Sequence, residues 1–226
     1  MVEHVRFDSN LVRNVSAGIN LLGYDSGNPS RQTVDIAIRQ NLFTGLSTAL
    51  GGNGWFILIG DEPRDVVLEH NTIDTNGTTV LNVYGGTATD PREILGFRMV
   101  ANAARHRTYG INGSFFSFGS GIINGFFPGA VFTANYLAGG SASRYPAGNL
   151  FAGVFDDQYA NIAVADYTVR EGSLLKRAAP DGGDIGVDHP ALEARVATVG
   201  AGINPWPSSL TAPVPPSNLS ITIGGR

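Results

Sequence analysis

Three acidic residues have the type and spacing for acid–base chemistry: Asp25, Asp61 and Glu62. Asp25 and Asp61 follow apolar segments that we predict to be equivalent strands in neighbouring repeats. Adjacent strands lie about 4.8 Å apart, so the two carboxylates could approach within about 5 Å. That is the separation used in retaining glycoside cleavage, and a close pair raises the pKa of one acid. Glu62 could take either role, but acids at strand ends are also ordinary turn residues, and both interpretations stay open.

A second candidate is the run Arg105-His106-Arg107. Two arginines suit the carboxylate or sulfate of an acidic sugar, because each guanidinium presents a planar fork of donors. Their charges would also keep His106 neutral near pH 7, as a general base requires. The alternative is a solvated turn with paired arginines.

A third set could form a platform for sugar rings. Aromatic faces stack on sugars, and side-chain amides bond to hydroxyl groups. Each member could equally face the core, because the sequence leaves the phase of its strand open. The residues are Tyr24, Trp55, Asn82 and Tyr84; Asn112 is a further substrate-binding candidate that belongs with the Arg105–Arg107 run. No spacing typical of a transition-metal site occurs, so we expect no metal of that kind.

The strands that must position these side chains are indicated by an asparagine that recurs at an almost constant interval along the chain. The gaps between successive copies are 31, 30, 31 and 33 residues. Alternating apolar and polar residues precede each copy, and the repeats contain Gly-rich turns but no helical pattern. Each repeat is therefore predicted to be one coil of a β-solenoid. The asparagines, which we expect to stack as a hydrogen-bonded ladder, are Asn10, Asn41, Asn71, Asn102 and Asn135.

Three strands are expected in each coil, and alternate residues of the strand before the asparagine should face inward. Between them Asp8, Arg39 and Glu69 should align on the surface with alternating sign. The period continues to 161–166 and then breaks. The fold class is therefore all-β: a right-handed parallel β-helix of about five to six coils over residues 1–195. Residues 196–226 are predicted to be a Pro-rich tail or linker with a terminal strand.

Composition supports this fold and excludes several functions. The 226 residues include 30 Gly and 12 Pro, which suits a fold with frequent turns. The net charge of −4 argues against a nucleic-acid partner, because nucleic-acid-binding proteins carry positively charged surfaces. The absence of basic clusters and of long apolar runs argues against a membrane partner. The chain begins in a strand without a signal peptide or a capping element. We expect the open first coil to be covered by self-association into a homo-oligomer.

Several segments resemble right-handed parallel β-helix proteins of the pectate-lyase-like superfamily. They are WFILIGDEPRDVVLEHNTI, FFPGAVFTANYLAGGSASRYPAGNLF and DYTVREGS…DGGDIGVDHPAL. More narrowly, the chain is similar to the C-terminal part of large bacterial β-helix proteins. That resemblance implies secretion or a place on the bacterial cell surface, and a groove along the solenoid that takes a polysaccharide or oligosaccharide.

Two functions follow as hypotheses. The first is a carbohydrate-active enzyme, a glycoside hydrolase or a polysaccharide lyase. Hydrolysis would use Asp25, Asp61 or Glu62. Elimination would use His106 or Arg107 as base, with Arg105 or a bound calcium ion neutralising the uronate; no cofactor is otherwise required. The alternative is a non-catalytic sugar-binding or structural solenoid, which is supported by the poor match to the family's catalytic signatures: Asn71-Thr72-Ile73-Asp74 carries one residue too many for Asn-Thr-Asp.

Overall fold

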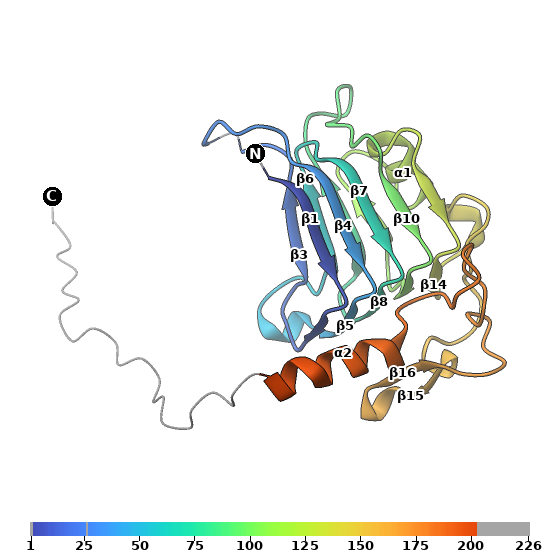
Figure 1. The fold of residues 1–226 in the computed structure, drawn as a ribbon. Coiled ribbons are helices and arrows are strands. Elements are labelled where there is room, and N and C mark those ends of the chain that lie inside the picture. The colour runs from blue at the N-terminus through green and yellow to red at the C-terminus, as the bar shows by residue number, and fades with distance from the viewer. Residues whose placement is uncertain (1, 26, 203–226) are drawn as a thin grey trace, which may run out of the picture.

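The computed structural model describes residues 2–25 and 27–202 and contains a parallel β-solenoid (Figure 1). Four coils each contribute one strand to each of three sheets, and a fifth coil contributes to two of them. The all-β solenoid class is therefore confirmed, with fewer coils than the five to six expected. The first sheet contains β1 (Glu3–Asp8), β4 (Val34–Arg39), β7 (Arg64–Glu69), β10 (Arg98–Val100) and β13 (Val131–Thr133).

The second and third sheets follow the same coil order. The second contains β2 (Leu11–Arg13), β5 (Leu42–Leu46), β8 (Thr72–Thr75), β11 (Ala103–Arg105) and β14 (Tyr136–Ala138). The third contains β3 (Ile19–Leu22), β6 (Ile57–Gly60), β9 (Thr79–Tyr84) and β12 (Gly110–Gly113). Short 3₁₀ turns are η1 (Thr48–Leu50), η2 (Ala142–Arg144), η3 (Asp156–Gln158) and η4 (Ile162–Val164).

The core lies between the three sheets and is built by stacking equivalent residues. Phe7, Ile38, Leu68, Met99 and Phe132 align across the first sheet, and all but Phe7 are buried. Val5 remains 38% exposed because β1 is the edge strand of that sheet. Self-association through this open coil stays a prediction.

The asparagine ladder forms as expected. Each Oδ1 accepts the side-chain amide of the asparagine one coil earlier, at 2.9 Å for Asn71 to Asn102. The same oxygen accepts a backbone N–H, and from Asn41 onward each Nδ2 also donates to a carbonyl, as Asn71 does to Ile38 at 2.8 Å. The residue before each rung has a left-handed φ between 52° and 59°. This turn aims the amide inward, so its polar atoms are paired although they are buried. These five left-handed residues are Ser9, Gln40, His70, Ala101 and Ala134.

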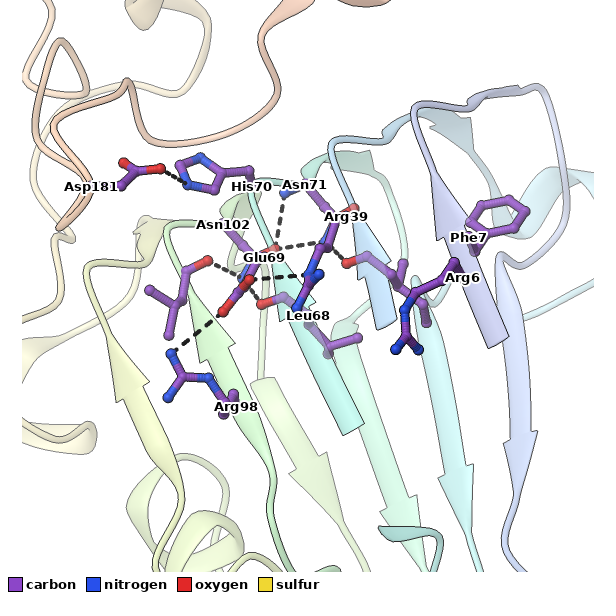
Figure 2. Close-up of polar contacts among 12 residues, drawn as sticks. Arg6, Phe7, Arg39, Leu68, Glu69, His70, Asn71, Arg98, Asn102 and Asp181 are labelled. Carbon is purple, nitrogen blue, oxygen red and sulfur yellow. Dashed lines mark hydrogen bonds and ion pairs between the residues drawn. The ribbon is translucent and has the colours of Figure 1, made fainter. Parts of the chain in front are cut away.

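The predicted surface ladder is also in register: Asp8, Arg39 and Glu69 occupy one row of the first sheet. Figure 2 shows Glu69 between two arginines. Its carboxylate lies 3.1 Å from Arg39 Nε, without hydrogen-bond alignment, and 3.5 Å from Arg98 Nη2. These half-exposed pairs fix register and add little stability.

The chain then turns back over the outer face of the second sheet. This returning segment, residues 150–202, contains the antiparallel pair β15 (Tyr159–Asn161) and β16 (Asp166–Val169) and helix α2 (His189–Gly202). The expected continuation of the coils through 161–166 is therefore wrong. In Figure 1 the orange and red α2 lies beneath the second sheet, and Arg195 reaches Ser9 of the first coil. Helix α2 continues across residue 195, where we predicted the β-helix to end and the tail to begin. The predicted terminal strand lies outside the described residues.

The second sheet is consequently buried on both faces. Its outer row packs under the aromatic residues of the returning segment in a second apolar cluster. The row comprises Leu42, Ala103 and Tyr136, and the aromatics are Phe155, Tyr159 and Tyr167. A helix, α1 (Ser120–Phe126), follows β12, the last strand of the third sheet, and buries Ile122, Ile123 and Phe126 beside it.

Candidate functional site

A groove lies where the third strands end, on the sheet that the returning segment leaves uncovered. Tyr24, Asp61, Glu62 and Arg92 line it, around a volume of about 420 Å³. Tyr24 follows β3 and the two acids follow β6, so neighbouring coils supply them. Among the candidate residues, the structure thus brings together Tyr24, Asp61 and Glu62, and it adds Arg92.

The two acids occupy a strained turn. Asp61 and Glu62 both adopt left-handed backbone angles, with φ of 49° and 69°. Such angles cost a non-glycine residue about 1 kcal/mol or more, and they recur at functional sites. Glu62 Oε2 accepts from Arg92 Nη1 at 3.3 Å, and its carbonyl accepts from Gln32 at 2.7 Å. These contacts hold the turn and leave the Asp61 carboxylate facing the groove.

Tyr84 completes this end of the sheet. Its ring lies over Gly60, where a β-carbon would overlap the ring atoms. Burial raises the pKa of Tyr84, and the negative charge of Asp61 raises it further. The Asp61 N–H also donates to the Tyr84 carbonyl at 3.2 Å, so Tyr84 adjoins the groove without being one of the residues that line it.

The structure also settles the phase of the third strands. Leu81 and Val83 are fully buried, whereas Asn82 and Tyr84 alternate with them and are half-buried on the outer face. Asn112 pairs with Asn82 in the β9–β12 register and faces the same way. Asn82 and Asn112 therefore form a short polar row on two neighbouring coils, next to Leu58 in the coil that carries Asp61.

Asp25, which we expected to pair with Asp61, does not lie at this site. The β3–β6 register pairs Leu22 with Gly60, so Asp61 lies beside Gly23 rather than Asp25. The prediction that the two aspartates end equivalent strands is wrong. Strand β3 ends three residues before Asp25, whereas β6 ends one residue before Asp61, so the two aspartates are offset by two residues. The Asp25 carboxylate instead accepts the N–H groups of Gly27, at 2.9 Å, and Asn28, at 3.1 Å. These hydrogen bonds, led by that from the Asn28 backbone, lower the pKa of Asp25.

Arg105 lies on the outer face of the second sheet, under the returning segment. Its Nε is 2.6 Å from Asp74 Oδ1, its Nη2 pairs with Asp156, and its guanidinium covers the Phe155 ring at 4.5 Å. Tyr167 donates to the other oxygen of Asp74 at 2.7 Å. Arg105 therefore ties the returning segment to the solenoid.

His106 points the opposite way, into the core, and is 4% exposed. Its Nδ1 donates to the Arg107 carbonyl at 2.8 Å, and its Nε2 lies 2.7 Å from the Tyr145 hydroxyl. Burial lowers the pKa of His106. Arg107 is exposed and donates to the Thr75 carbonyl at 2.6 Å. Arg105 and Arg107 thus line one pocket of about 350 Å³, but His106 faces the core and does not join them.

Trp55 stands at the other end of its strand from the groove. Six residues separate it from Asp61, which corresponds to about 20 Å in an extended strand. Within residues 2–25 and 27–202, no group of three or more acidic or histidine side chains is arranged to hold a metal ion. The described chain also contains no helix long and apolar enough to cross a membrane.

Comparison of the sequence and the structure with protein-family models, characterised proteins and solved structures found no significant match. The parallel β-solenoid is therefore established by the coordinates alone, and the superfamily suggested by the sequence remains a resemblance.

Proposed function

We propose that this chain is a carbohydrate-binding solenoid that holds an oligosaccharide against the outer face of its third sheet. The observation that carries the proposal is the groove lined by Tyr24, Asp61, Glu62 and Arg92, which Tyr84 adjoins. Ligand sites combine apolar or aromatic surface with a few convergent polar groups, and this groove has that composition. Tyr24, 38% exposed, offers a ring for stacking.

The polar row formed by Asn82 and Asn112 extends the surface beyond the groove. Neighbouring coils are about 4.8 Å apart, so successive side chains could meet successive hydroxyl groups of one sugar chain. The resemblance to pectate-lyase-like β-helix proteins supports this placement. It also supports the finer proposal that the chain belongs to that superfamily and acts outside a bacterial cell.

The charge of the groove favours a neutral sugar. Asp61 and Glu62 contribute two negative charges and Arg92 one positive charge, which leaves a net charge of −1. A uronate would be repelled here. The arginines expected to attract an acidic sugar are elsewhere, because Arg105 is engaged by Asp74 and Asp156.

Glycoside hydrolysis is a second candidate, favoured by one observation: Asp61 and Glu62 are adjacent acids in left-handed conformation within the same groove. It has less support than binding, since Asp25 caps its own loop. Elimination has even less support than hydrolysis, because the proposed base His106 is buried against Tyr145.

Calorimetric titration with neutral and uronate oligosaccharides tests the proposal. We expect neutral oligomers to bind and Tyr24→Ala to weaken binding by about tenfold, since a well-packed aromatic contact contributes about 1 kcal/mol or more. Tyr109→Ala is the matched control, because Tyr109 is 40% exposed outside the groove. Binding without release of reducing sugar supports a binding module, and release abolished by Asp61→Asn supports a hydrolase. Failure of every oligosaccharide to bind contradicts both.

A further inference from the structure

His70 joins the solenoid to the returning segment through both of its ring nitrogens. Nε2 lies 3.1 Å from Oδ2 of Asp181, a contact drawn in Figure 2. Nδ1 lies 3.2 Å from the carbonyl oxygen of Asp184 and 3.3 Å from that of Gly186. The ring is mostly buried, with 15% of the side chain exposed.

All three partners of the ring are hydrogen-bond acceptors. A neutral imidazole carries one N–H, so one of its nitrogens would present a lone pair to an acceptor. Only the imidazolium donates on both sides. We propose that His70 is a proton-dependent latch, which holds residues 181–187 on the solenoid when protonated and releases them when it loses its proton.

The latched loop is seated by close backbone contacts. Gly186 donates to the carbonyl of Ala101 at 2.8 Å, and Val187 donates to Thr72 Oγ1 at 3.0 Å. A β-carbon on Gly186 would lie 2.6 Å from that hydroxyl, and its φ of 94° also requires glycine. These contacts leave the loop little freedom to shift while it stays in place, and it forms one wall of a pocket of about 310 Å³.

The other charged groups around His70 are engaged elsewhere. Asp184 accepts from Lys176 at 3.2 Å, and Lys176 also pairs with Glu171. Asp188 accepts the N–H of Ala191 at the start of α2. The remaining titratable groups are His189, beside Asp166 at 3.5 Å, and Glu69, beside Arg39 and Arg98. Asp181 is thus the carboxylate that faces the ring directly.

The direction of the pH dependence follows from these partners. The Gly183 N–H, and secondarily the charge of His70, lower the pKa of Asp181, so its contribution is lost only as the pH falls through that lowered value. The imidazolium of His70 can donate to acceptors on both sides, and one of these two contacts is lost when the ring loses its proton. The latch should therefore be closed in mild acid and open in mild alkali.

Hydrogen exchange of the Gly186 and Val187 amides tests the latch between about pH 5.5 and about pH 8.5, where histidines titrate. Protection is expressed relative to the Asn102 amide of the ladder, which corrects for general unfolding. Between these limits we expect relative protection to fall by about tenfold, the effect of losing one hydrogen bond to a charged group. In His70→Gln the ratio should not depend on pH.

Asp181→Asn is the second variant, and its position is exposed enough to tolerate the change. The asparagine amide can donate to a neutral Nε2 while Nδ1–H still bonds the carbonyls, so protection should stay high across the range. Equal protection at both pH values in the parent chain would overturn the proposal. So would a pH dependence that persists in His70→Gln or in Asp181→Asn.

Discussion

The side-chain amide of Asn135 donates to Oδ1 of Asn149 at 3.0 Å, although only 14 residues separate them. Earlier rungs of the ladder are about twice as far apart in sequence. Asn149 also donates to the carbonyl of Phe132 at 3.1 Å, as a regular rung would. It therefore ends the ladder without a further coil, and the amide of Asn135 is not left unpaired inside the fold.

Removing a central rung should be far more destabilising than removing this last one. In Asn71→Ala the backbone and side-chain N–H groups of Asn41 both lose their acceptor, at 3.2 Å and 2.9 Å. Each buried group left unpaired costs about 1–3 kcal/mol, so we expect a loss of about 3 kcal/mol or more in the free energy of unfolding. Asn149→Ala also removes the acceptor of two N–H groups, those of Asn135, but at a half-buried position where water can replace it, so it should cost about 1 kcal/mol. Urea unfolding measures both, and equal losses would contradict a cooperative ladder.

Breaking the Arg105 ion pair should loosen the returning segment. Arg105 and Asp74 are 18% and 19% exposed, and removing one partner of such a pair leaves a largely buried charge. We expect Arg105→Ala to lower the free energy of unfolding by about 3 kcal/mol. Arg98→Ala, at an exposed pair with Glu69, is the control and should cost less than about 1 kcal/mol. A loss in Arg105→Ala no larger than in the control would show that the pair does not anchor the segment.

Gly60→Ala should impair sugar binding more than stability. The added methyl group would overlap the Tyr84 ring, which must then swing away from the groove. We expect binding of a neutral oligosaccharide to weaken by about tenfold, as for other displaced aromatic contacts. Gly27→Ala is the matched control, since its β-carbon would meet only the Asp25 carboxylate, at 3.4 Å. Unchanged affinity in Gly60→Ala would remove Tyr84 from the site.

Four buried tyrosines should make the fold sensitive to alkali. Burial raises the pKa of Tyr136 and of Tyr145 to about 12, and it raises that of Tyr159 and Tyr167 further. A raised pKa means that folding favours the neutral phenol, so this stability is complete below about pH 10 and is lost as the pH rises above it. In an ultraviolet titration these residues should ionise together with unfolding. A gradual ionisation of all seven tyrosines without loss of structure would contradict this prediction.

The repeating part of the molecule could be read from the sequence because its contacts obey a constant period. The ladder from Asn10 to Asn135 and the inward stack of Ile38, Leu68 and Met99 follow from one spacing and from strand alternation. The same pattern placed Tyr24, Asp61, Glu62 and Tyr84 at the ends of third strands. Arg92 was missed because it lies on a connection of variable length, where no period constrains position.

Other features depended on contacts between residues far apart in the chain. The offset between Asp25 and Asp61 arises where β3 gives way to its loop, and a shift of two residues separates carboxylates that spacing alone would pair. Whether His106 faces solvent or the core was decided by Tyr145, 39 residues away. The sequence by itself determined the coil, since a periodic pattern specifies its own neighbours. Only the tertiary structure decided which face is covered, because the returning segment docks by non-local contacts, such as that of Tyr167 with Thr44, that carry no period.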